Sequence, residues 1–178
     1  MSVQIRTRIK MCGFTREADV QAAVQAGADA IGFVLYPPSP RAVSIERAAE
    51  LAALLPAFVT PVLLFVNEAP ERVQAACAAV PGALLQFHGD ETPEYCTELS
   101  RQTGRPHLKA ARIPLEAAAS FDLLKFAQLH HHAQAILLDA HVDGFGGGGK
   151  AFNWSLLPPS VNAHLVLSGG LTPANVAD

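Results

Sequence analysis

The sequence has little of what ties a protein to nucleic acids or membranes. Its basic residues are dispersed without a Lys/Arg run, and it has only 1 Trp and 2 Tyr to stack on bases, so nothing favours a nucleic-acid partner. No apolar stretch is long enough to span a bilayer, and the first ten residues lack the apolar core of a signal peptide. These absences predict a cytoplasmic protein without membrane contact.

Cysteine is also scarce. The 3 cysteines, Cys12, Cys77 and Cys96, are odd in number, far apart and without a Cys-x-x-Cys pair, which argues against a disulfide framework and against a zinc site. Cys77 and Cys96 fall on predicted apolar helix faces and are assigned to packing. For Cys12 both packing and chemistry stay open.

The residues that are present predict a protein with a substantial core. Half of the 178 residues are hydrophobic, and the formal net charge is -3. This composition fits one globular domain, which we place at residues 1–178.

Short apolar runs alternate with segments of helical spacing along the whole chain. The expected strands are residues 5–11, 30–35, 62–66, 84–87, 107–110, 136–138 and 164–167, and the expected helices are 16–26, 44–55, 70–79, one from Pro93, 115–129 and one opening at Thr172-Pro173. Nearly all-apolar strands joined to helices by short loops indicate a parallel sheet covered on both faces or closed into a barrel.

The barrel is favoured over a doubly wound sheet, because no Gly-x-Gly-x-x-Gly follows the first expected strand. We therefore predict a TIM (β/α)8 barrel of which this chain covers about seven of the eight βα units. An eighth strand and its phosphate loop are expected beyond Asp178, although a swapped unit from a partner stays open. In such barrels the strand C-termini form the working face.

Polar residues follow the expected strands at that face: Cys12, Arg41, Asn67, His88, Asp139 and Ser168-Gly169-Gly170. Asp139 ends an apolar run and is either structural or catalytic. A cysteine and an aspartate across a barrel mouth would make an acid–base pair. Arg41, beside three prolines, is either a solvated charge or a carboxylate ligand. Ser168-Gly169-Gly170 offers bare backbone N–H groups for a phosphate.

Two further stretches have competing interpretations. The glycines at 146–149 alone would suggest a linker, but Leu-Leu-Asp before them and Lys150, Phe152 and Trp154 after them suggest an ordered loop, with Asn153 as a helix N-cap. The cluster from His88 to Glu91 lacks zinc spacing, so His88 is interpreted as a hydrogen-bonding residue at the mouth. His130, His131 and His132 are assigned to an exposed helix end.

Six motifs in order resemble one family, the phosphoribosylanthranilate isomerases of tryptophan biosynthesis. They are Lys10-Met11-Cys12-Gly13, Ser39-Pro40-Arg41, Phe65-Val66-Asn67, Leu85-Gln86-Phe87-His88-Gly89, Leu138-Asp139 with Gly146 to Trp154, and Ser168-Gly169-Gly170-Leu171. Gly148 stands where the family usually has a small hydroxyl residue, and Asn153 where it usually has Asp.

The resemblance implies an Amadori rearrangement of N-(5-phosphoribosyl)anthranilate without metal or organic cofactor. It implies Asp139 as general acid, Cys12 as general base, and Arg41 as ligand of the anthranilate carboxylate. His88 and Ser168 would also line the substrate site, and Gly147, Gly148, Gly149, Gly169 and Gly170 would hold the phosphate. A monomer or homodimer is expected. The rivals are another phosphosugar barrel enzyme of tryptophan or histidine biosynthesis, against which Cys12 argues, and a catalytically inactive barrel fragment.

Overall fold

The computed structural model describes residues 6–115, 121–140, 154 and 157–176. The chain divides into two units, Met1–Leu85 and Gln86–Asp178. Within each unit, parallel strands adjacent in the chain are also neighbours in the sheet. None of the described helices is both long and apolar enough to cross a membrane.

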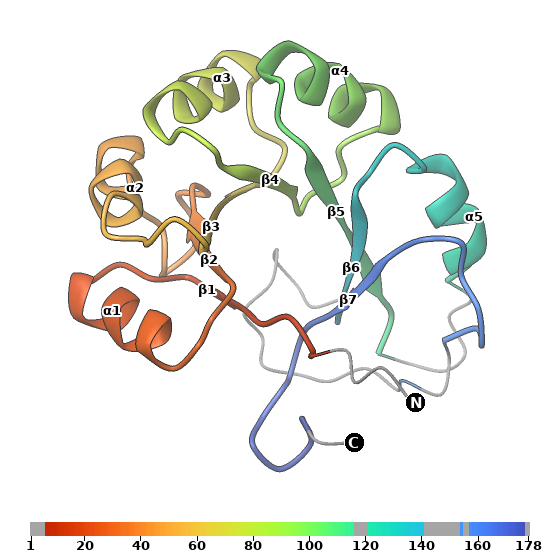
Figure 1. Cartoon of the computed structure of the whole chain (residues 1–178). Helices are drawn as coiled ribbons and strands as arrows, with labels where there is room; N and C mark the ends of the chain where they lie inside the picture. The colour runs from red at the N-terminus through yellow and green to blue at the C-terminus, as the bar shows by residue number, and fades with distance from the viewer. Residues whose placement is uncertain (1–5, 116–120, 141–153, 155–156, 177–178) are drawn as a thin grey trace. The chain divides into compact units, whose positions relative to one another are not determined.

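The first unit repeats strand and helix three times. Its strands are β1 (Lys10–Cys12), β2 (Ala30–Val34) and β3 (Thr60–Phe65), and its helices are α1 (Glu17–Gln25), α2 (Ile45–Ala52) and α3 (Pro70–Ala79). The three helices lie on the same side of these strands (Figure 1). Cys12 pairs with Gly32 across the β1/β2 ladder, and Gly32 pairs with Val62 across β2/β3.

The start of the first strand was predicted wrongly. We expected residues 5–11 to be extended, but β1 begins at Lys10. The reason is Asp29, whose carboxylate accepts hydrogen bonds from the Arg6 guanidinium, from the Arg8 guanidinium at 2.9 Å and from the Ile9 N–H at 2.8 Å. These bonds, led by that of Arg6, hold the pKa of Asp29 below its usual range. Residues 6–9 are therefore anchored by the Asp29 side chain, and the Ile9 carbonyl also accepts the backbone N–H groups of Asp29 at 2.8 Å and Ala30 at 3.2 Å.

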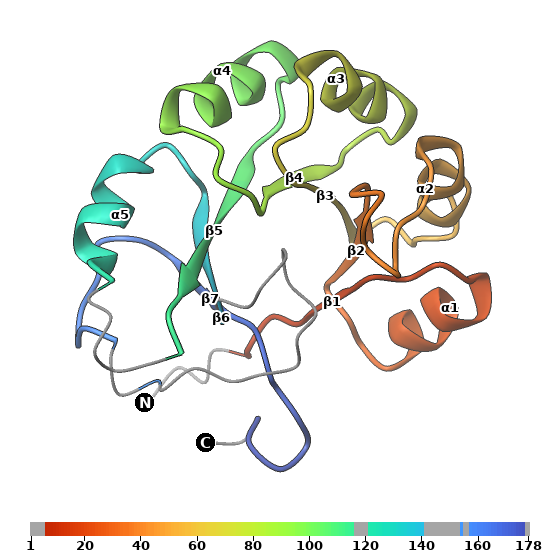
Figure 2. The same cartoon turned by 180° about the vertical axis from the view of Figure 1, so that it is seen from behind.

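The second unit continues the alternation. It contains β5 (His107–Ile113), β6 (Ala135–Ala140) and β7 (Leu165–Leu167), with α4 (Pro93–Thr103) and α5 (Leu123–Leu129), while β4 (Leu84–Phe87) contains the boundary between the units. Seen from behind, α4 and α5 still lie outside the β5 and β6 strands (Figure 2). The β5/β6 ladder pairs Arg112 with Asp139. The predicted alternation of strands and helices is thus confirmed, and both predicted strands in this ladder are longer than expected.

Helix starts follow local capping chemistry. The Ser44 hydroxyl accepts the Arg47 N–H at 3.1 Å, and the Thr92 hydroxyl accepts the Tyr95 N–H at 3.2 Å. The helix predicted at 115–129 begins only at Leu123, because the Asp122 carboxylate accepts the Lys125 N–H at 2.9 Å and caps it there. Residues 116–120 lie outside the described part of the chain.

The segment from Thr172, where a helix was expected to open, forms a turn as far as it is described. The Val176 N–H donates to the Thr172 carbonyl at 3.0 Å, and the Asn175 side chain bridges the Thr172 N–H and the Gly170 carbonyl. These contacts order the chain after β7.

The core of the second unit lies between its strands and α5. Ala111 and Ile113 of β5 and Ile136, Leu138 and Ala140 of β6 pack against Leu123 and Ala127 of α5. Alternate residues of a strand face opposite sides. Asp139 therefore lies on the opposite face from this core, whereas Lys109 lies on the core side.

Three histidines are buried in the second unit, His88, His107 and His130, and burial shifts the pKa of the last two. His107 is 2% exposed and its Nδ1 lies 2.7 Å from the Ser100 hydroxyl, while His130 is 7% exposed and packs on the Phe126 ring. Burial, as the main cause, lowers the pKa of these two imidazoles from 6.5 to about 4. Both rings are therefore neutral in the folded protein at pH 7.

Stability should fall on acidification. Below pH 6.5 these histidines bind protons in the unfolded chain, whereas in the folded protein they bind protons only near pH 4. Between these two pH values each ring therefore lowers the free energy of unfolding by up to about 1.4 kcal/mol per pH unit. Urea unfolding at several pH values between 7 and 4 should show a shallower slope for His107→Asn than for the unmodified protein. The exposed His131→Asn is the control. Equal slopes in all three proteins would contradict the prediction.

Candidate active site

In the first unit, the side chain of Cys12 sits over a glycine. Cys12 is the last residue of β1 and is half-buried. A Cβ added to its ladder partner Gly32 would lie 2.5 Å from Cys12 Sγ. Any larger residue at position 32 would displace the thiol, so the observed position of the Cys12 side chain requires glycine at position 32.

A second glycine brings Arg41 to the same strand end. The Arg41 Nη1 donates to the Cys12 carbonyl at 2.9 Å. Gly13 has φ +94, and a Cβ there would lie 2.5 Å from Arg41 Nη1 and 2.6 Å from its Cδ. Only glycine suits both this backbone and this space. The sequence predicted Cys12 and Arg41 at strand ends, and the structure joins them by this contact.

In the second unit, Asp139 forms a buried hydrogen bond with a histidine. His88, which directly follows β4, has its Nε2 3.0 Å from Asp139 Oδ2, and the two residues are 5% and 9% exposed. The Gln86 Nε2 amide lies 2.9 Å from His88 Nδ1. With the amide as donor, Nδ1 accepts and the ring proton sits on Nε2, facing the aspartate. The Ala140 N–H donates to Asp139 Oδ1 at 3.0 Å.

The sequence did not reveal a buried ion pair next to this histidine. Lys109 Nζ and Glu91 Oε2 lie 2.8 Å apart, and both side chains are 2% exposed. Both also contact Gly89: Lys109 donates to its carbonyl at 2.7 Å, and the Glu91 carboxylate accepts its N–H at 2.9 Å. A lysine within the apolar run His107 to Ala110 was the available signal, because a buried lysine requires a partner. The sequence analysis also missed Gln86, a buried polar residue within the β4 strand.

The Ser168-Gly169-Gly170 segment turns sharply after β7. Both glycines have positive φ, 78 and 64, and the Ser168 hydroxyl donates to the Leu138 carbonyl at 2.8 Å. Within the described part of the chain, neither glycine N–H is a donor in a hydrogen bond. Backbone amides in such a turn are of the kind that can bind an anion.

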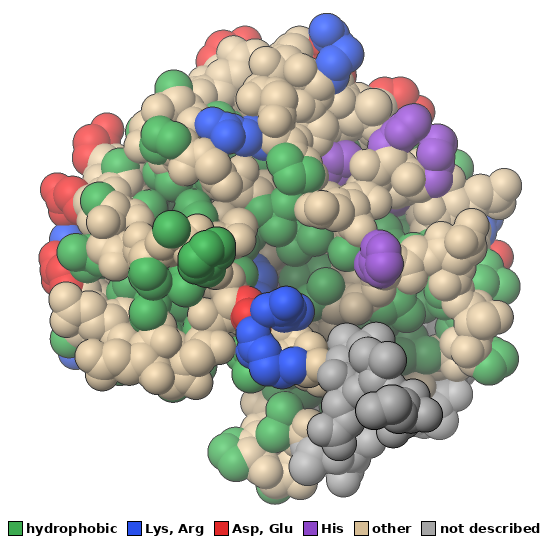
Figure 3. Space-filling model, viewed as in Figure 1, with side chains coloured by type: hydrophobic (Ala, Val, Ile, Leu, Met, Phe, Trp, Pro, Cys, Tyr) green, Lys and Arg blue, Asp and Glu red, His purple; other side chains and the backbone are tan. Residues whose placement is uncertain are grey.

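Three other predictions need comment. Gly147, Gly148, Gly149 and Asn153 lie outside the described residues. The histidine run was assigned to an exposed helix end, which is wrong for His130, because its ring is buried against Phe126 while His131 and His132 stay exposed. Histidine side chains are visible on the surface in Figure 3. Over the described ranges no three His, Cys, Asp or Glu side chains form a group suited to a metal.

The cysteines should differ in reactivity. In the folded protein one thiol, that of half-buried Cys12, should react readily with Ellman's reagent, whereas burial raises the pKa of Cys96 to about 12 and Cys77 is only 6% exposed. Those two should react at least about tenfold more slowly, since the chain must open first. The Cys12→Ser variant should lose the fast phase, and a fast phase that survives this substitution would contradict the assignment.

Comparison with known proteins matches this chain to one family. The family model described as N-(5'phosphoribosyl)anthranilate (PRA) isomerase matches residues 9–178. The N-(5'-phosphoribosyl)anthranilate isomerase of Methylibium petroleiphilum is 62% identical over 174 residues, covering 98% of this chain and 78% of that protein. That of Leptothrix cholodnii is 61% identical, covering 97% of this chain and 75% of the relative.

Solved structures agree. The crystal structure of the Thermus thermophilus enzyme matches with a TM-score of 0.82 at 34% identity, and that of the Thermotoga maritima enzyme with 0.81 at 38%. Each match covers 96% of this chain and 80% of the solved chain. The likeness confirms the predicted α/β class and TIM-barrel fold. The chain belongs to the N-(5'-phosphoribosyl)anthranilate isomerase family.

Proposed function

We propose that this chain isomerises N-(5'-phosphoribosyl)anthranilate to 1-(2-carboxyphenylamino)-1-deoxyribulose 5-phosphate, a step of tryptophan biosynthesis, with Asp139 as general acid and Cys12 as general base. The observation that carries the proposal is the match of residues 9–178 to this isomerase family together with a buried, doubly hydrogen-bonded Asp139 at the end of β6. One related isomerase has been crystallised with a reduced form of this product.

The surroundings of Asp139 suit the acid step. Asp139 would protonate the furanose ring oxygen, the bond from that oxygen to C1 would break, and the anthranilate nitrogen would form an imine with C1. The aspartate left behind is a carboxylate. His88 Nε2–H and the Ala140 N–H both donate to it, at 3.0 Å each, and so stabilise the form that develops as the proton leaves.

The base step would fall to Cys12. Its thiolate would remove the proton from C2, and the electron pair would form the C1=C2 bond of an enaminol while the C1=N pair returns to nitrogen. Loss of the C2 hydroxyl proton with protonation at C1 would then give the aminoketose. Every step moves protons and electron pairs within one substrate, so the reaction needs no oxidant, metal or organic cofactor. The half-buried position of Cys12 over Gly32 leaves its sulfur reachable.

Substrate binding would use both charged ends of the ligand. Arg41, whose Nη1 lies 2.9 Å from the Cys12 carbonyl, would bind the anthranilate carboxylate next to the base. The Gly169 and Gly170 amides after β7 would bind the phosphate. Fixing both ends orients C1 and C2, and such positioning supplies a large part of an enzymatic rate. Further roles for Ser168 and the glycine loop 147–149 stay predictions.

The proposal also covers assembly and location. One solved relative, the Thermotoga maritima enzyme, is described as dimeric. For this chain we retain the predicted alternatives of monomer and homodimer, and the predicted cytoplasmic location.

Removing either proton-transfer group should lower kcat. Cys12→Ala and Asp139→Asn should each reduce turnover of N-(5'-phosphoribosyl)anthranilate by roughly two to four orders of magnitude, because each step loses its acid or base. Turnover can be followed by the decay of substrate fluorescence, and circular dichroism checks the fold. Cys77→Ala, which changes a buried cysteine of α3, is the control. Near-normal turnover of Cys12→Ala with loss in the control would overturn the assignment of the base.

Arg41 should act on binding. Its contact with a carboxylate would exist in both ground state and transition state, so Arg41→Met should raise KM by about 10- to 100-fold, the equivalent of a lost charged hydrogen bond, while kcat changes little. Arg72→Met, which removes an arginine of α3 paired with Glu68, is the matched control from the same unit. A large fall in kcat at unchanged KM would make Arg41 a catalytic residue instead.

A further inference from the structure

The backbone of Gly89, the residue after the active-site histidine, is held by two buried charges. Gly89, itself buried, directly follows His88. Lys109 Nζ donates to the Gly89 carbonyl at 2.7 Å, and Glu91 accepts the Gly89 N–H with both oxygens, at 3.1 and 2.9 Å. The pair is closed by the 2.8 Å contact between Lys109 and Glu91. The donor and acceptor of one residue are thus bound from both sides; we call Lys109 and Glu91 the Gly89 clamp.

The clamp does not face the carboxylate that would do the chemistry. Lys109 alternates with Ala111 and Ile113, which pack against α5, whereas Asp139 alternates with the α5-facing Leu138 and Ala140 and so points to the other side. The clamp is connected to the aspartate through Gly89 and the His88 ring.

Stability alone is a poor reason for such a pair. Taking two charges out of water costs several kcal/mol per ion, and well-packed apolar residues often serve a core equally well or better. What apolar residues cannot do is bind both the N–H and the carbonyl of a buried glycine. The function that the charges supply is therefore the conformation of the turn after β4.

We infer that Lys109 and Glu91 are positioning residues for the proposed isomerase reaction, acting by fixing the Gly89 peptide so that His88 Nε2 stays in hydrogen-bond contact with Asp139. The inference rests on the proposed function for its kinetic consequence, but the contact itself can be observed without any assay. Displacement of a catalytic group by about 1 Å can cost up to about 100-fold in rate.

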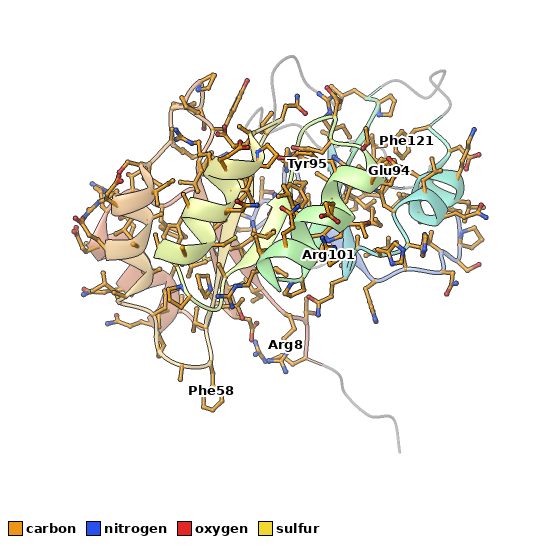
Figure 4. All side chains as sticks on the ribbon, turned by 90° about the horizontal axis from the view of Figure 1, so that it is seen from above. Arg8, Phe58, Glu94, Tyr95, Arg101 and Phe121 are labelled. Atoms are coloured by element: carbon orange, nitrogen blue, oxygen red, sulfur yellow. The ribbon has the colours of Figure 1, made fainter. Side chains whose placement is uncertain are left out.

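The test uses two double variants without an unpaired buried charge. Lys109→Met/Glu91→Leu removes the clamp, whereas Lys109→Met/Glu91→Gln keeps an oxygen that can accept the Gly89 N–H. The control is Glu98→Gln/Arg101→Met, which neutralises a 2.6 Å ion pair on α4 with both side chains solvent-exposed. Arg101 of this pair is labelled in Figure 4. Measurements are kcat, KM, urea unfolding and the ¹⁵N signals of the His88 ring.

The Leu variant should lose about 10- to 100-fold in kcat at a KM within about twofold, with shifted His88 ring signals. The Gln variant should lose less, and the control nothing. A folded Leu variant with unchanged kcat and unchanged His88 signals would overturn the inference. If the Leu variant does not fold, kcat and the His88 ring signals of the Gln variant decide, and no change in either would overturn the inference. If the unmodified protein has no isomerase activity, the proposed function fails, and the His88 signals alone then decide whether the clamp exists.

Discussion

The buried carboxylate of Asp139 is the constraint on which the second unit depends. A carboxylate that is 9% exposed needs donors, and the structure provides the Ala140 N–H and the His88 ring. The histidine in turn requires the Gln86 amide at its other nitrogen, which selects the tautomer. A glutamine inside the β4 strand is explained in this way. One buried acid thus determines the chemistry of three neighbouring positions, and the same donors suit it to release a proton.

In the first unit, the positions of Cys12 and Arg41 depend on the space left by two glycines. These glycines are required because other side chains already occupy the room that a Cβ would take: Cys12 over Gly32, and Arg41 over Gly13. At Gly13 the positive φ adds a second reason. The proposed base and the proposed carboxylate ligand are therefore kept together by the absence of side chains between them. Exposed residues such as Phe58, which is 97% exposed and protrudes from its loop, have no such role in this unit (Figure 4).

Charge burial in this protein has opposite consequences at different sites. The imidazoles of His107 and His130 are buried and neutral, so they contribute packing at pH 7 and lower the stability of the folded protein in acid. Lys109 and Glu91 are buried as a pair and bind backbone groups of Gly89. The pair restrains a turn beside the proposed acid, whereas His107 packs near Ser100 of α4 and His130 packs on Phe126 of α5. Burial alone does not distinguish such roles; the atoms in contact do.

The sequence by itself determined the alternation of strands and helices, the starts of α2, α3 and α4 near Ser44, Pro70 and Pro93, and the placement of Cys12, His88 and Ser168 at strand ends. These follow from period, propensity and capping, all of which act between residues close in the chain. Only the tertiary structure decided that Asp29 shortens β1, that His130 is buried, and that Lys109 and Glu91 bind Gly89. His88 and Asp139 are 51 positions apart and Lys109 and Gly89 are 20 apart. Such partners meet only after the strands pair, so no local pattern records them.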